Sequence, residues 1–163
     1  MLALGDALAV CVHRRRGFTR EQYAFFHPGG DLGRQFVRVR EVMRSGDRNP
    51  VVRETASIQE AMLAITRARA GAACIVDAAG ALAGVFTDGD LRRLLQAGGE
   101  RRLGESIGSV MTRKPTTIGP DRYAAEAVSI LRGRKIDELP VVDAAGRPVG
   151  MLDVQDLLDA GLV

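Results

Sequence analysis

The hydrophobic pattern of the second half of the chain alternates between a helical period and short apolar runs. Ser57 and Glu60 have the S-x-x-E spacing of a capping box, which predicts a helix start. An apolar stripe follows at the spacing of one helix face: Ile58, Ala61, Met62 and Ile65. Two short apolar runs, 72–77 and 82–87, flank an AAG turn and predict strands. A second helix is expected from about Asp88.

The same order of elements recurs further along the chain. IVDAAGALAGVFTDGDLRRLL (75–95) aligns with VVDAAGRPVGMLDVQDLLDAG (141–161) at an offset of 66 residues, and the VM pairs at 42–43 and 110–111 align at an offset of 68. The second copy therefore predicts strands at 139–143 and 148–153 and a closing helix near Val154. Two copies of one structural unit are present.

Alternating helices and strands predict an α/β (α+β) fold in which small sheets are covered by helices. One unit of about 55 residues is marginal alone, so the two copies are expected to pack together. With 46% hydrophobic residues, 4% aromatic residues and no tryptophan, the core must be built from small aliphatic side chains.

Composition also limits the environment of the protein. No run of 18 apolar residues exists, and the charges near the start follow the apolar stretch rather than precede it. These observations argue against a membrane span and a signal peptide, and predict a cytoplasmic protein with no membrane partner. Cys11 and Cys74 lie among apolar residues, and both are expected to be buried, reduced thiols.

The positive charge is concentrated at the start of the chain. Residues 1–40 hold seven arginines against three acidic residues, a local net charge of +4, whereas the whole chain carries +3. A basic arm of this kind could contact nucleic acid, but no aromatic residues are interleaved with the cations. The HRRRG run fits a solvated helix end instead, so no nucleic-acid partner is expected.

The repeated unit resembles the CBS domain, and the stretches PVVD…G…VGMLDVQDLL and CIVD…G…AGVFTDGDLRRLL are typical of that family. The resemblance implies a tandem CBS pair, with two β-α-β-β-α units that associate through their sheets about a pseudo-twofold axis. It also implies a regulatory role, since CBS pairs commonly bind adenine nucleotides or related ligands and control an attached enzyme or transporter.

The first 40 residues resemble another domain. MLALGDALAV, RGFT and HPGGDLGR are similar to the end of the sugar-isomerase domain in bacterial arabinose-5-phosphate isomerases of the KpsF type, a family in which that domain precedes a CBS pair. The resemblance implies a remnant of that domain at 1–40, one CBS domain at 41–100 and another at 101–163. It also implies a link to ribulose 5-phosphate/arabinose 5-phosphate interconversion, which supplies Kdo for lipopolysaccharide.

His27 falls on the histidine of the HPGG motif, so the resemblance makes it catalytic in a parent protein. An aldose–ketose isomerase needs a base, a group that handles the oxygen protons, and a cradle for the phosphate. One histidine cannot supply all three. Glu21 and Asp31 could act as bases in principle, but no serine- or glycine-rich phosphate loop precedes a helix here. The chain is expected to be a C-terminal fragment without isomerase activity. A complete isomerase and a free-standing nucleotide sensor acting on a separate partner remain alternatives.

TDGD places a hydroxyl and a carboxylate three residues apart where a strand meets a helix. Thr87 as N-cap and Asp90 as the acidic member of a capping box account for the pair structurally. The same geometry can bind a nucleotide, because helix N-termini bind phosphate and a carboxylate accepts hydrogen bonds from a ribose diol. In CBS pairs these two residues typically contact phosphate and ribose, so Thr87, Asp88 and Asp90 are candidate ligand-binding residues.

The second copy carries Asp153 and Asp156 at the corresponding positions, and both are weaker candidates because Asp153 would repel a phosphate. Arg134 and Lys135 precede the second copy's strand and would offset that charge only if they turned inward, whereas a solvated helix end is the expected role of both. The base is expected near Ala73 and Cys74. AMP, ATP or CMP-Kdo is the expected regulatory ligand, with no required cofactor and no metal site.

A homodimer or higher oligomer is expected. Apolar residues recur at helical spacing near the start of the chain, at Leu2, Leu8, Cys11 and Val12. An exposed apolar face of this kind tends to find a partner, and CBS pairs commonly dimerise through their helices.

Overall fold

The structure is a computed structural model that describes residues 2–17 and 31–163. The chain divides into two compact units, Met1–Val37 and Arg38–Val163. The first contains helices α1 (Leu2–Arg15) and α3 (Asp31–Arg34). Within the described residues, no helix combines the length and the apolar character needed to cross a bilayer.

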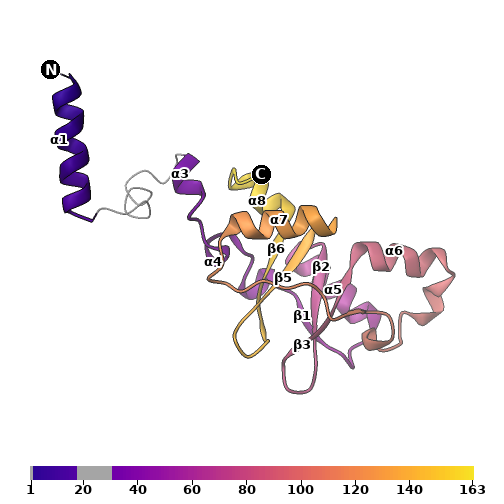
Figure 1. Ribbon diagram of the computed structural model, residues 1–163. Helices are drawn as coiled ribbons and strands as arrows, with labels where there is room; N and C mark the ends of the chain where they lie inside the picture. The colour runs from indigo at the N-terminus through magenta and orange to yellow at the C-terminus, as the bar shows by residue number, and fades with distance from the viewer. Residues whose placement is uncertain (1, 18–30) are drawn as a thin grey trace. The chain divides into compact units, whose positions relative to one another are not determined.

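The second unit contains the two predicted copies in succession (Figure 1). The helix and strand bounds of the first copy are α4 Val39–Val42, β1 Val51–Arg53, α5 Ile58–Ala68, β2 Ala72–Val76, β3 Leu82–Thr87 and α6 Asp88–Gln96. Those of the second copy are β4 Thr112–Arg113, α7 Ala124–Arg134, β5 Glu138–Val142, β6 Pro148–Asp153 and α8 Val154–Asp159. Short 3-10 turns fill the connections at Gly46–Arg48, Gly99–Arg102 and Ile107–Ser109.

The predicted elements are confirmed. The Ser57 hydroxyl accepts a hydrogen bond from the Glu60 amide at 3.1 Å, and the Glu60 carboxylate accepts one from the Ser57 amide at 2.7 Å, so the capping box starts α5. All four hairpin strands agree with the prediction to within one residue. The pattern of residues did not predict β1 and β4, because strands of three and two residues are too short to show a period.

Each of the two sheets is completed at one edge by a short segment from the other copy, an arrangement called the exchange of edges below. The first has the order β1-β2-β3-β4, with β1 parallel to β2 and the other pairs antiparallel. The second contains β5 and β6, and single bridges Ile118↔Val141 (parallel) and Arg44↔Met151 (antiparallel) repeat the outer pairings of the first sheet. The segment at the start of each copy, at Arg44 or at Thr112–Arg113, therefore pairs with the hairpin of the other copy. The expected β-α-β-β-α unit occurs twice.

Two glycines permit this exchange. A Cβ at Gly150 would lie 2.5 Å from Met43 Sδ and 2.7 Å from the Arg44 carbonyl oxygen. A Cβ at Gly84 would meet Met111 Sδ at 2.7 Å and the Thr112 carbonyl at 2.8 Å. The two close approaches are equivalent, so they establish that Arg44 and Thr112 occupy corresponding places.

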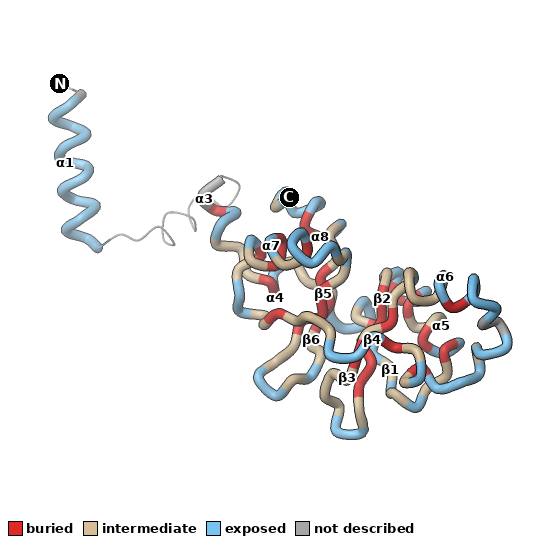
Figure 2. The backbone as a smooth tube through the Cα atoms, turned by 45° about the vertical axis from the view of Figure 1, so that its right-hand side comes forward, coloured by how far each residue is buried: buried red, intermediate tan, exposed pale blue. Residues whose placement is uncertain are grey.

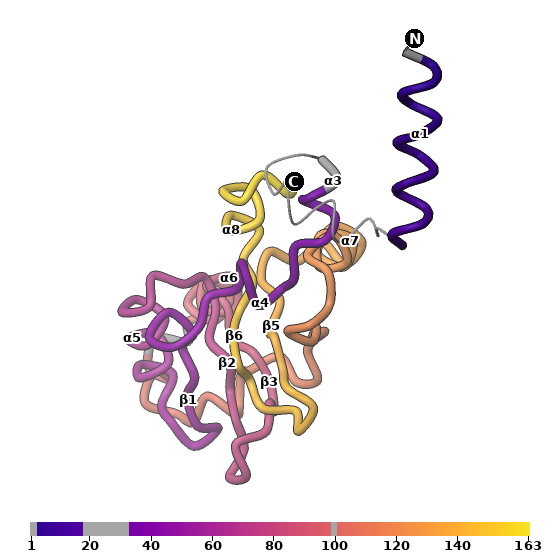
Figure 3. Tube along the Cα trace, turned by 90° about the vertical axis from the view of Figure 1, so that its left-hand side faces the viewer, coloured from indigo at the N-terminus to yellow at the C-terminus, as the bar shows by residue number. Residues whose placement is uncertain are grey.

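The core lies between the hairpins and the helices that cover them, where buried positions gather in Figure 2. The β2–β3 and β5–β6 hairpins lie side by side with their turns at the same end (Figures 1 and 3), and the Leu82 amide donates to the Gly146 carbonyl at 2.9 Å. Ala72 and Cys74 pack against Met151 between the two sheets. The expected association through the sheets is therefore confirmed.

The cysteines differ in burial. Cys74 is buried as predicted, and burial raises the pKa of its thiol to about 12. The prediction for Cys11 is wrong, because its thiol is exposed on α1. An apolar stripe on a helix predicts burial only when another element covers it.

Candidate functional site

A reciprocal cap fixes Thr87 and Asp90 where β3 meets α6. The Thr87 amide and hydroxyl each donate to Asp90 Oδ2 at 2.9 Å, and the Asp90 amide donates to Thr87 Oγ1 at 3.1 Å. Arg93, one turn along α6, donates to the other carboxylate oxygen, Asp90 Oδ1, at 2.6 Å. The expected capping box is therefore confirmed. It uses the Asp90 amide, and the Asp88 amide donates to the Gly71 carbonyl, which leaves the Gly89 amide at the start of α6.

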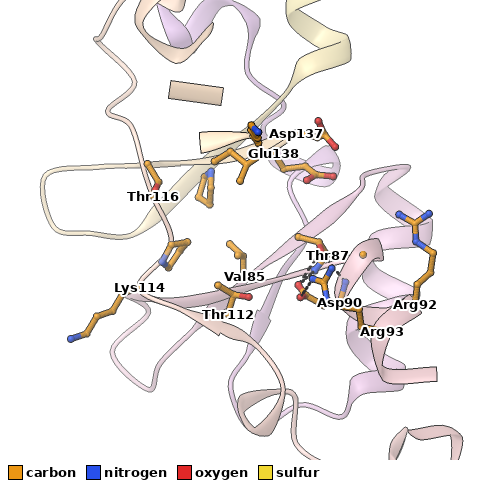
Figure 4. A pocket seen from close by; sticks show the side chains of 15 residues that line it. Val85, Thr87, Asp90, Arg92, Arg93, Thr112, Lys114, Thr116, Asp137 and Glu138 are labelled. Carbon is orange, nitrogen blue, oxygen red and sulfur yellow. Dashed lines mark hydrogen bonds and ion pairs between the residues drawn. The ribbon is translucent and has the colours of Figure 1, made fainter. Parts of the chain in front are cut away.

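This cap forms one wall of a cleft of about 550 Å³. The volume is within the range of small-ligand pockets, roughly 300–1,000 Å³. Figure 4 shows Thr87, Asp90 and Arg93 on one side and Asp137 and Glu138 on the other. The residues that line the cleft are Val85, Thr87, Gly89, Asp90, Arg92, Arg93, Thr112, Lys114, Pro115, Thr116, Lys135, Ile136, Asp137, Glu138 and Pro140.

The cleft draws its walls from both copies. The first copy supplies the end of β3 and the start of α6. The second copy supplies Thr112 and 114–116 from its first segment, and the turn between α7 and β5. That turn begins at Lys135, whose left-handed backbone (φ 54°) ends α7. Each wall thus brings both cations and carboxylates to a space with apolar patches, which suits a ligand that carries both an anionic group and hydrogen-bond donors.

Glu138 is the most perturbed acid of the cleft. Burial raises the pKa of the Glu138 carboxyl to about 7, with further contributions from the negative charges of Asp153, Asp137 and Asp88, while Arg44 acts in the opposite direction. A Cβ at Gly71 would collide with this carboxylate. The carboxyl group can therefore exchange a proton near neutral pH.

The corresponding cap in the second copy is occupied by an arginine. Arg44 Nε donates to both oxygens of Asp156, at 2.8 and 3.0 Å, and its Nη2 lies 3.3 Å from Asp153 Oδ2. Nη1 donates to the Arg69 carbonyl at 3.0 Å. These four groups are called the Arg44 cluster below: the Arg44 side chain, the two carboxylates and the Arg69 carbonyl. The side chains of Arg44, Asp153 and Asp156 are 14%, 19% and 18% exposed.

Ala73 and Cys74, the residues expected beside the base, are not among those that line the cleft. Both are fully buried, and the strand register pairs them with Phe86 and Val85. The Cys74 amide also donates to the Pro50 carbonyl at 2.9 Å. Their side chains are in the core and their backbone takes part in the sheet, so the wall opposite Thr87 is formed by the second copy instead.

Two other candidates lie off the cleft. Asp88 is exposed at the start of α6, and its amide donates to the Gly71 carbonyl at 2.9 Å. Arg134 is exposed at the end of α7 and is not part of the Arg44 cluster. The cation that neutralises Asp153 and Asp156 comes instead from Arg44, 112 residues before Asp156.

Sequence reasoning missed Arg93, Lys135 and Glu138 as cleft residues. The signal for Arg93 was present, since an arginine three residues after Asp90 on a helix can reach its carboxylate. Lys135 and Glu138 could not be found without knowing that the copies exchange edges.

His27 and Glu21 lie outside the described residues. In the part of the chain that the structure describes, no group of three or more His, Cys, Asp or Glu side chains is arranged to hold a metal ion.

The chain is similar to curated proteins named arabinose 5-phosphate isomerase KdsD. It is 46% identical to the protein of Pseudomonas aeruginosa and 43% identical to that of Escherichia coli K12, in each case over 99% of this chain. An uncharacterized protein of Rickettsia prowazekii is 35% identical over the same share. The chain spans about half the length of each of these relatives.

Solved structures share the fold of the second unit. CBSX2 of Arabidopsis thaliana in complex with AMP matches with a TM-score of 0.66 and 27% identity, over 77% of this chain and 96% of that one. The CBS domain pair of protein MJ0100, solved with 5-methylthioadenosine and S-adenosylmethionine, matches with a TM-score of 0.69, 23% identity and 77% and 96% coverage. The CBS domain family matches residues 39–97 and 107–162. The chain therefore belongs to the CBS domain family and carries a tandem CBS pair.

Proposed function

We propose that the CBS pair is a regulatory module that binds one adenine nucleotide, AMP or ATP, in the cleft. The phosphate would lie over the start of α6 beside Gly89, where the Gly89 amide and a Thr87 hydroxyl turned from Asp90 would donate hydrogen bonds, and the ribose diol would donate to Asp90. The observation that carries the proposal is the cleft itself, which joins this cap to cations and to an apolar wall. The 27% identical CBSX2 complex contains AMP.

The charges of the cleft suit this orientation. Arg93 is 71% exposed and held at a single carboxylate oxygen, so it can turn from Asp90 toward a bound phosphate. Lys135 lies on the opposite wall. The base would lie against Ile136 and Pro140, which are partly or fully buried apolar residues of the second copy. This position replaces the one expected at Ala73 and Cys74.

The regulated activity that we propose is arabinose-5-phosphate isomerisation, since the chain is similar along its length to half of proteins with that name. We also propose that this chain alone does not catalyse the reaction. Incubation with ribulose 5-phosphate followed by assay for arabinose 5-phosphate should show no turnover. Turnover that disappears in the His27→Ala variant would contradict this.

Calorimetric titration tests the ligand site. AMP, adenosine and CMP-Kdo are titrated into the wild type, Asp90→Asn and, as the matched control, Asp156→Asn. We expect AMP to bind the wild type and its affinity to fall about 10- to 100-fold in Asp90→Asn, as for a lost hydrogen bond to a charged group. Asp156→Asn should change affinity by less than about threefold. Binding of CMP-Kdo in preference to AMP would overturn the adenine assignment.

We further propose that a second copy of the chain covers α1. Leu8 and Val12 lie one turn apart on this helix and are 60% and 49% exposed, and Leu4 is 67% exposed. Light scattering should give at least a dimer, and Leu8→Glu should lower the mass toward that of a monomer. A monomeric wild type at high micromolar concentration would refute this assembly.

A further inference from the structure

The Arg44 guanidinium is fully engaged inside the second unit. Its Nε binds both oxygens of Asp156, its Nη2 faces Asp153, and its Nη1 binds the Arg69 carbonyl. The side chain is 14% exposed, so most of it is covered by the surrounding protein. A planar guanidinium held by a carboxylate, a second anion and a carbonyl is a well-satisfied arrangement.

Each partner of this guanidinium has a counterpart on the wall of the cleft. The 66-residue offset relates Asp153 to Thr87 and Asp156 to Asp90. It also relates Arg69 to Lys135, and the two residues share a left-handed backbone at a helix end, with φ of 50° and 54°. All three counterparts line the cleft. The Arg44 guanidinium therefore fills the place that is open space in the cleft.

The residue that corresponds to Arg44 is Thr112, which also lines the cleft. The correspondence rests on backbone geometry as well as on sequence. Arg44 pairs with Met151 in β6, as Thr112 pairs with Val85 in β3, and Met151 and Val85 are also 66 residues apart. Threonine is too short to reach the cap, so this side chain decides whether the space beside the cap is open or filled.

Arg93 does not close the cleft in the same way. It comes from the helix that carries Asp90, contacts one carboxylate oxygen and is 71% exposed. A ligand can displace an exposed side chain held at one point more readily than a mostly covered one held at three.

We propose that Arg44 is a built-in occupant of the second nucleotide position and thereby limits the CBS pair to one ligand. Removal of its side chain opens a position for a ribonucleoside, with the diol at Asp156. Asp153 would still repel a phosphate there, so the opened position takes adenosine more readily than AMP. This inference rests on the proposed function, because it assumes that the cleft binds an adenine nucleotide.

The test counts ligands by calorimetry on the full chain, with adenosine and AMP as probes. The Asp90→Asn background weakens the cleft about 10- to 100-fold, and each probe is titrated below the weakened Kd so that the cleft stays empty. In that background we expect no adenosine binding with Arg44 intact, one adenosine per chain with Arg44→Thr, and one AMP per chain with Arg44→Thr/Asp153→Thr. Asp153→Thr with Arg44 intact is the matched control and should bind neither probe. Circular dichroism and thermal melting verify that each variant is folded.

The outcomes separate the two hypotheses. Failure of the wild type to bind either probe overturns the proposed function, while binding that appears only after Arg44 is removed still supports this inference. The inference is overturned if folded Arg44→Thr variants gain no site, or if Asp153→Thr alone opens one. Should the Arg44 variants not fold, the otherwise wild-type Asp156→Asn protein decides. Unchanged one-to-one AMP binding supports the inference, and loss of binding overturns it.

Discussion

The cleft and the Arg44 cluster are built on the same frame but differ in what fills them. Both lie where a β-hairpin meets the start of a helix, beside an edge segment lent by the other copy. At the cleft that segment carries Thr112 and leaves open space, whereas at the cluster it carries Arg44 and the space is closed by ion pairs. The comparison teaches that a duplicated fold can keep its backbone and change the use of a position through one side chain.

Substitution of either of the two equivalent glycines, Gly150 or Gly84, should destabilise the protein to the same extent. In Gly150→Ala and in Gly84→Ala the new Cβ would collide with a backbone carbonyl at 2.7 or 2.8 Å. We expect each to lower the free energy of unfolding by about 2–3 kcal/mol, measured by urea denaturation. Gly133→Ala on α7, where nothing lies within 4 Å of the added atom, is the control and should stabilise by about 0.5–1 kcal/mol. A large effect at one of the two glycines alone would contradict the equivalence.

Arg44 in the Arg44 cluster and Arg93 at the cleft should differ in their contribution to the free energy of unfolding. Arg44→Met removes the cation from two partly buried carboxylates, which keep only backbone amide partners, and we expect a loss of about 2 kcal/mol. Arg93→Met removes an exposed ion pair and should change stability by less than about 0.5 kcal/mol. A double-mutant cycle with Asp156→Asn would isolate the coupling. Equal losses in the two methionine variants would show that the cluster is not a structural cross-link.

Exchanging one cap for the other sharpens the comparison. Thr87→Asp gives the cleft the cap of the second copy. Because aspartate caps a helix as well as threonine does, stability should stay within about 0.5 kcal/mol. AMP affinity should fall about five- to tenfold through repulsion of roughly 1 kcal/mol, while adenosine affinity should not change. An equal loss for adenosine and AMP would place the phosphate elsewhere.

The smallest expected effect is the change in stability with pH that the ionisation of Glu138 causes. The folded-state pKa of its carboxyl, about 7, is above the ordinary value of 4.5, so folding favours the protonated form. Its ionisation therefore removes stability as the pH rises from about 4.5 to about 7, and the penalty is complete above that range.

Glu138→Gln removes this ionisation. At pH 8 the variant should be more stable than the wild type by an amount on the order of 1 kcal/mol, a value discounted because the group is partly solvated. Near pH 4, where Glu138 is neutral in both states, the difference should vanish. Thermal melts across this range measure it, and a gain of equal size at both pH values would contradict the assignment.

The sequence predicted whatever is local and repeated. The capping boxes at Ser57 and Thr87, the hairpin strands and the pairing of two copies were all readable, because each depends on residues within one unit. The cleft was only half predicted. Its cap was identified, but the base was expected near Ala73 and Cys74 of the same copy, whereas the wall opposite the cap belongs to the second copy.

The missing step was the exchange of edge segments, which depends on contacts far apart in sequence. Arg44 reaches Asp156 across 112 residues, and no pattern in HRRRG or VMRSG distinguishes it from a solvated arginine. The offset of 68 between the VM pairs was visible, but its meaning required the backbone approach to Gly150 and Gly84.

The exchanged edges also bear on how such a protein can arise and be divided. Cut between its repeats, the chain would give two peptides with incomplete sheets, the first without Thr112–Arg113 beside β3 and the second without Arg44 beside β6. Each half would carry a bare strand edge that another half can complete, as in a symmetric homodimer of single repeats. In such a homodimer one gene encodes both subunits, so every substitution appears in both. Fusion into one gene removes that constraint, and one repeat can keep an open cleft while the other turns its cap into an internal ion pair.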